Sequence, residues 1–172
     1  MVLGIFMLVG SDVGLNSNIA NFLQNQFGLT LERASLGISL YFTALMIGRF
    51  SGAVILNWIS SRRFLLLTAI VSLISLIGML LAQSVLMVQI AIFMVGLGSA
   101  NLFPLIFSIA LEKMPDRANE ISGLMIMAVS GGAFLPPLMG MVSTNLGVKA
   151  SFLVLVMAMV YLVSAGVYAL KK

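Results

Sequence analysis

Two ionisable residues lie deep inside long apolar stretches of the sequence. Asp12 is about ten residues from the start of the first stretch, and Arg49 is about ten residues from the end of the second. In helices that rise about 1.5 Å per residue, both would be roughly 15 Å deep. Because an isolated charge inside a membrane-spanning or buried helix is costly, we predict that Asp12 and Arg49 form a buried ion pair. The pair would either lock two neighbouring helices together or take part in moving a solute.

Four carboxamide side chains could bind a hydroxyl-rich ligand. Asn16, Asn18 and Asn21 follow Asp12 within three helical turns, and Asn101 lies near the middle of a later apolar stretch. A carboxamide offers donors and acceptors together, which is what hydroxyl groups need. We predict that these four residues line a hydrophilic cavity. The alternatives are that the first three belong to the polar outer end of a helix, and that Asn101 only packs between helices.

Glycine and proline interrupt two of the apolar stretches. Pro104 follows Asn101, and Gly131, Gly132 and Pro136 lie together in a later stretch. Proline removes a backbone hydrogen bond, so we predict a bend or break at each place. Such breaks are tolerated where protein or a water-filled path satisfies the freed carbonyls, and they are frequent at substrate sites and gates. For Gly131 and Gly132 alone, close packing of two helices is the favoured interpretation.

The residue inventory excludes most catalytic chemistry. The chain has no Cys and no His, which removes thiolate and imidazole metal ligands and Ser-His or Cys-His nucleophile systems. Asp12 is the only carboxylate well inside an apolar stretch, whereas acid–base hydrolysis usually needs a second group. We therefore expect no enzyme, no metal and no cofactor. The net charge is +4, but the cations form no basic stripe, so anionic lipid is favoured over nucleic acid as the partner.

The composition predicts an all-α protein that spans a membrane several times. Hydrophobic residues make up 61% of the chain and charged residues 8%, far from the balance of a soluble domain. Apolar runs of about 20 residues, the length needed to cross a bilayer, predict six transmembrane helices in a single domain over residues 1–172. They cover about residues 2–26, 34–58, 64–82, 86–111, 121–143 and 150–170.

The distribution of Lys and Arg predicts the orientation. Cytoplasmic loops carry an excess of these residues. Only Arg33 and Lys149 fall on one side of the six predicted helices; the other side carries Arg62, Arg63, Lys113, Arg117, Lys171 and Lys172. Both termini are therefore expected in the cytoplasm.

Several motifs together resemble one family of membrane proteins. Residues 48–52 (Gly-Arg-Phe-Ser-Gly), followed by Arg62-Arg63, are similar to helix eight and the next loop of the major facilitator superfamily. Residues 9–13 (Val-Gly-Ser-Asp-Val) resemble a Val-Gly-x-Glu-Val stretch in helix seven of the fucose permease family, with Asp12 in place of the Glu. Residues 95–108 look like helix ten of that family, and residues 122–136 look like helix eleven.

The resemblance implies a function for the chain. It implies the C-terminal half, helices seven to twelve, of a bacterial inner-membrane transporter that moves a neutral sugar by proton-coupled symport and alternating access. The sugar would be of the fucose, glucose or galactose type. The expected partners are the lipid bilayer, the sugar, the proton, and a missing N-terminal six-helix half or a second copy of this chain. Two alternatives stay open: a membrane interaction or assembly subunit without a substrate, and a truncated transporter without activity.

Overall fold

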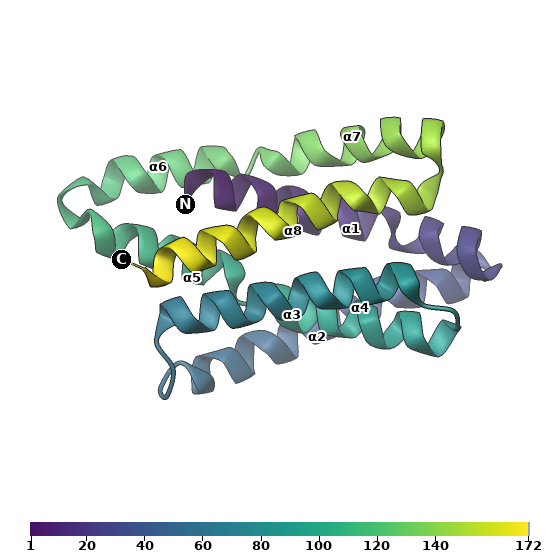
Figure 1. The fold of residues 1–172 in the computed structure, drawn as a ribbon, viewed down its shortest axis with the longest axis horizontal. Coiled ribbons are helices and arrows are strands. Elements are labelled where there is room, and N and C mark those ends of the chain that lie inside the picture. The colour runs from purple at the N-terminus through teal and green to yellow at the C-terminus, as the bar shows by residue number, and fades with distance from the viewer. Residues whose placement is uncertain (172) are drawn as a thin grey trace.

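The computed structural model describes residues 1–171 and consists of long helices joined by short turns (Figure 1). In chain order the described elements are α1 (Val2–Phe27), α2 (Leu31–Ile55), α3 (Ser61–Leu81), α4 (Val85–Ser99), α5 (Leu102–Lys113), the 3-10 turn η1 (Pro115–Arg117), α6 (Ala118–Ala128), α7 (Gly131–Leu146) and α8 (Val148–Leu170).

Six helical segments are long and apolar enough to cross a membrane, which confirms the predicted fold class. They are α1, α2, α3, the pair α4–α5 (Val85–Lys113), the run from η1 to α7 (Pro115–Leu146), and α8. The second segment ends at Ile55, about three residues earlier than predicted. The fifth begins about six residues earlier than predicted, because the loop before it is folded into η1 and the first turn of α6.

The local sequence explains where several helices end. Gly28 takes a left-handed conformation (φ 64°) and donates its backbone N–H to the carbonyl of Gln24, which caps α1. Gly147 also has a positive φ (89°) and allows the chain to reverse between α7 and α8. At the start of α4, the Ser84 side chain accepts a hydrogen bond from the backbone N–H of Met87 at 3.3 Å.

Two membrane-spanning segments are broken near the residues that the sequence indicates. Because Pro104 has no N–H, the carbonyl of Ala100 has no donor four residues later, and α4 ends at Ser99 before α5 begins at Leu102. Pro136 in the same way frees the carbonyl of Gly132, close to the interruption between α6 and α7. There the N–H of Gly132 bonds only three residues back, to the carbonyl of Val129 at 3.1 Å.

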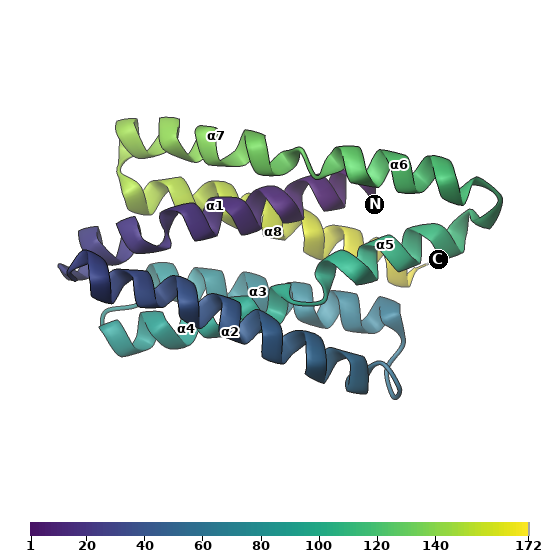
Figure 2. The same cartoon turned by 180° about the vertical axis from the view of Figure 1, so that it is seen from behind.

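The helices form one bundle in which α1 has a central position (Figures 1 and 2). α1 contacts α7 and α8 on one side and α2 on the other, while α3 packs against α4 and α8. The fourth segment is the most enclosed, with 56% of its apolar window buried, and α2 is the least enclosed, with 22%. A large part of the α2 surface therefore lacks a protein neighbour in this chain.

Glycines bring α1 and α7 into backbone contact. A Cβ at Gly131 would overlap the carbonyl oxygen of Phe6, and a Cβ at Gly10 would lie 2.8 Å from the carbonyl oxygen of Gly131. Neither contact could be relieved by moving a side chain, because the obstructing atoms belong to the backbone. Gly131 thus serves close helix packing, the interpretation that its sequence context favours.

Candidate functional site

Asp12 and Tyr41 join α1 to α2 by a side-chain hydrogen bond. The Tyr41 hydroxyl donates to Oδ1 of Asp12 at 2.8 Å, and Tyr41 itself is fully buried. The Asp12 carboxyl is partly buried, about ten residues into α1. A carboxyl so far inside a span needs a partner because water is scarce there. In this structure the partner is a neutral phenol.

The predicted ion pair between Asp12 and Arg49 is not formed here. The only ion pair with N and O atoms within 4.0 Å among the described residues is Arg117–Glu120, on the surface. Arg49 lies eight residues beyond Tyr41 on α2, and its charge acts on Asp12 only across a gap longer than 4.0 Å. The prediction assumed that the start of α1 and the end of α2 are level. Tyr41, the residue that meets Asp12, lies 14 residues before the end of α2.

The Arg49 side chain is exposed on the open face of α2. Met46 and Phe42 lie one and two turns before Arg49, and Phe50 is the next residue; Phe42, Met46 and Phe50 are 53%, 57% and 73% exposed. Together with Leu45 these residues line a shallow cavity of about 380 Å³. A cation and large apolar side chains thus share a surface that the described part of the chain leaves uncovered. We call this set (Phe42, Met46, Arg49, Phe50) the open α2 face.

The side chains of Asn16, Asn18 and Asn21 form hydrogen bonds within α1. Asn16 donates to the Asp12 carbonyl and Asn18 to the Gly14 carbonyl, both at 2.8 Å. The Asn21 side chain accepts from Nδ2 of Asn25 at 2.6 Å. Oδ1 of Asn16 is buried and has no partner among the described residues. It lies one turn from Asp12, so an acceptor is available beside the Asp12–Tyr41 pair.

Asn101 packs between helices, and it also borders a cavity of about 380 Å³ that α2, α3 and α4 line. Its side chain is 7% exposed, and Nδ2 donates to the Gly48 carbonyl of α2 at 2.7 Å. A Cβ at Gly52 would overlap the Asn101 amide, so Gly48 and Gly52 form a notch that receives it. This is the packing alternative that the sequence left open. In this conformation one of the two N–H donors of Asn101 is used by the Gly48 carbonyl, and a sugar contact by this residue stays a prediction.

The structure also places the remaining predicted residues, Gly132 and Pro136, and shows polar contacts that the sequence does not indicate. Gly132 packs against Val13, whose Cγ2 would lie 3.0 Å from an added Cβ, and Pro136 is half-buried in α7. The sequence does not single out Tyr41, nor the buried hydrogen bond between the Ser72 and Ser99 hydroxyls at 2.9 Å. A lone hydroxyl in an apolar span gives little signal, since it can bond its own helix. Among the described residues, no three His, Cys, Asp or Glu side chains gather as a metal site would require.

A comparison with protein families decides the assignment, because the Major Facilitator Superfamily description matches residues 1–171. The chain belongs to the Major Facilitator Superfamily. The sequence motifs in α1, α2, α4–α5 and α6–α7 predict this assignment, and the match confirms it.

Relatives within the Major Facilitator Superfamily carry sugar-transporter names. The chain is 28% identical to a glucose/galactose transporter of Brucella abortus over 172 residues, which is 99% of this chain and 42% of that protein. It is 31% identical to a putative glucose/galactose transporter of Helicobacter pylori over 144 residues, 84% of this chain and 35% of that protein. The chain therefore spans less than half the length of the curated relatives it matches.

Solved structures show the same fold. A crystal structure of the transporter FucP in its outward conformation superposes with a TM-score of 0.91 at 20% identity, covering 98% of this chain and 41% of FucP. A second crystal structure, of a single-substitution variant of FucP, the fucose:proton symporter of E. coli, gives the same values. The chain thus has the fold of one half of a Major Facilitator Superfamily transporter, a multi-pass membrane protein.

Proposed function

We propose that the chain transports a neutral sugar by proton-coupled symport, as the C-terminal half of an alternating-access transporter. The names of the Brucella and Helicobacter relatives support a sugar of the glucose or galactose type. The likeness of the fold to that of a fucose:proton symporter supports proton coupling.

The Asp12–Tyr41 hydrogen bond is the observation that carries this proposal. A carboxyl inside a span is expensive to keep charged, so such groups are characteristic of proton relays in transporters. Asp12 has one hydroxyl donor and no cation within 4.0 Å among the described residues, so its proton can exchange without breaking an ion pair. The unpartnered Asn16 acceptor lies beside it and can receive a sugar hydroxyl. Proton and sugar would then meet at one site.

The open α2 face supports the need for a partner. A guanidinium facing lipid in the middle of a span costs about 2.5–3.5 kcal/mol on insertion scales. Arg49 is exposed in the isolated chain, so a second protein surface would remove this cost by covering Arg49 and Phe50. We propose that the cover is an N-terminal six-helix half, or a second copy of this chain. Asn18 and Asn21 would face the cavity between the two parts.

The helix interruptions would supply the movement. The breaks before Pro104 and near Gly131, Gly132 and Pro136 leave backbone carbonyls that can change partners. We propose that the two interruptions act as the gating positions of alternating access.

The proposed location is a bacterial inner membrane with both termini in the cytoplasm. α1 begins and α8 ends at the same end of the bundle (Figure 1). The excess of Lys and Arg at that end supports the orientation. A cysteine replacing Lys113 should react only from the cytoplasmic side, and one replacing Lys149 only from the opposite side. Labelling of both positions from one side would contradict the orientation.

Uptake by proteoliposomes tests the transport proposal. The chain is reconstituted alone and together with an N-terminal half from one of the relatives, and labelled glucose, galactose and fucose are offered with and without a pH gradient. We expect gradient-driven uptake of one sugar class by the two-part protein. Asp12→Asn should abolish the effect of the gradient and leave sugar exchange without a gradient intact. Absence of uptake in both preparations, with correctly folded protein, would favour an assembly subunit without a substrate.

A further inference from the structure

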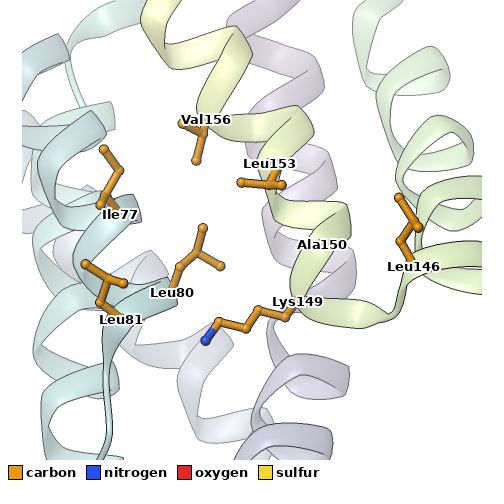
Figure 3. Close-up of a pocket in the computed structure, with 8 residues that line it drawn as sticks. All are labelled: Ile77, Leu80, Leu81, Leu146, Lys149, Ala150, Leu153 and Val156. Atoms are coloured by element: carbon orange, nitrogen blue, oxygen red, sulfur yellow. The ribbon is translucent and has the colours of Figure 1, made fainter.

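A second cavity lies far from Asp12, between the end of α3 and the start of α8. Its volume is about 510 Å³, within the range of roughly 300–1,000 Å³ that small-molecule sites occupy. Leu80, Leu153 and Val156 are among the apolar side chains that line it, and Lys149 is the only charged one. Figure 3 shows the Lys149 side chain extending from the start of α8 toward α3, below Leu80.

The walls of this cavity are apolar and open to the surroundings of the bundle. Leu81 is 70% exposed and Leu153 is 55% exposed, whereas Leu80 is buried and forms part of the floor. From Lys149 to Val156 the wall on α8 runs for seven residues, about 10 Å. In a protein that spans a bilayer, an elongated apolar groove of this kind is in contact with acyl chains and not with water.

The Lys149 ammonium forms no ion pair with the described residues of the protein. No carboxylate lies within 4.0 Å of it among the described residues. Lys149 is the second residue of α8 and lies at the N-terminal end of that membrane-spanning helix. From there a lysine amine reaches the level of the lipid headgroups. A phosphate with a net negative charge would supply the missing partner. A zwitterionic headgroup already neutralises its phosphate with its own ammonium.

We propose that this groove is a binding site for an anionic phospholipid in the leaflet opposite the chain termini. One acyl chain lies between α3 and α8 along Leu80, Leu153 and Val156, and the headgroup phosphate pairs with Lys149. The pairing joins a basic side chain to an anionic headgroup at the membrane surface. The site is independent of the transport proposal, because it needs neither Asp12 nor a second half.

Native mass spectrometry of the whole chain in detergent tests this site. The probes are phosphatidylglycerol, phosphatidylcholine with the same acyl chains, and glycerol 3-phosphate, which has no acyl chain. We expect phosphatidylglycerol to bind several-fold more tightly than phosphatidylcholine, and glycerol 3-phosphate not to compete. Lys149→Gln should weaken phosphatidylglycerol binding about fivefold, equivalent to about 1 kcal/mol, and Lys149→Arg should retain it.

Two further variants separate the site from general surface charge. Arg33 lies at the same end of the bundle, at the start of α2 and outside the groove, so Arg33→Gln should leave phosphatidylglycerol binding unchanged. Leu153→Trp fills the groove and should weaken binding of both phospholipids. Equal affinity for the two phospholipids, equal losses in Lys149→Gln and Arg33→Gln, or full competition by glycerol 3-phosphate would each overturn the proposal.

Discussion

α1 meets two of its neighbours, α7 and α2, in opposite ways. Against α7 it presents Gly10, which lies close to the backbone of Gly131, and the two main chains leave no room for a side chain. Against α2 it presents Asp12, which is held by the Tyr41 hydroxyl. The first contact has only one workable geometry, because backbone atoms cannot move aside. The second depends on one proton and one hydrogen bond, which can be exchanged, so the side of α1 toward α2 is the one suited to change during function.

The glycine contact should be the most sensitive position of the bundle. In Gly131→Ala the new methyl group would collide with the Phe6 carbonyl, and we expect a loss of about 3 kcal/mol in unfolding free energy, the upper range for overpacking. Unfolding by SDS in mixed micelles, followed by circular dichroism, measures it. Gly140→Ala is the matched control on α7, where an added Cβ meets nothing within 4 Å. Similar losses in both variants would show that the close approach is not what fixes α1 to α7.

The second-largest loss of unfolding free energy is expected for a substitution of Asn101. Asn101→Ala removes the bond to the Gly48 carbonyl and leaves the notch at Gly52 empty, for an expected loss of about 2 kcal/mol. The same unfolding measurement applies. Asn145→Ala, which removes an exposed carboxamide that bonds only its own helix, should change stability by less than about 0.5 kcal/mol. If Asn101→Ala is equally silent in unfolding but weakens sugar binding, Asn101 belongs to the cavity after all.

Breaking the Asp12–Tyr41 hydrogen bond between α1 and α2 should cost less stability than the Gly131 and Asn101 substitutions. Tyr41→Phe removes the donor to Asp12 and should cost about 1.5 kcal/mol. In a double-mutant cycle, Tyr41→Phe and Asp12→Asn should show coupling, because the two residues are in contact. The cycle of Arg49→Gln with Asp12→Asn should show weaker coupling, because the two charges interact only across a gap longer than 4.0 Å. A larger coupling energy between Asp12 and Arg49 than between Asp12 and Tyr41 would support the predicted Asp12–Arg49 ion pair.

The smallest effect concerns sugar binding. Asn21→Ala, in a chain supplied with its second half, should weaken binding about three- to tenfold, the value of one neutral hydrogen bond. Calorimetry in detergent measures it, and Asn145→Ala on α7 is the control. Asn25→Ala is unsuitable as a control because Asn25 bonds the Asn21 side chain directly. Unchanged affinity in Asn21→Ala would remove this residue from the site.

The sequence predicts the spans and their interruptions well, because hydropathy and proline act locally. Pro104 removes one backbone donor wherever the rest of the chain lies, and the break before it follows. The partner of Asp12 is a different problem. The partner depends on the relative axial position of α1 and α2, which the sequence does not give. In the sequence, Tyr41 is also indistinguishable from other aromatic residues in apolar spans. In the same way the polarity of Asn101 is visible in the sequence, but the glycine notch that receives it belongs to another helix.

The two helix interruptions also have a mechanical meaning. The hairpin made of α5, η1 and α6 has one interruption at each of its two ends. By contrast, α3 and α8 cross the bundle unbroken (Figure 2). Only Met125 and Ala128 of α6 are buried, so this half of the hairpin is weakly held by the rest of the bundle. α5 is held in the bundle by five buried residues, so α6 is the part of the hairpin that can tilt, at the interruption before α7. A force on the turn at Pro115–Arg117 would therefore act mainly on the interruption at Ser130, whereas α3 and α8 have no interruption at which to bend.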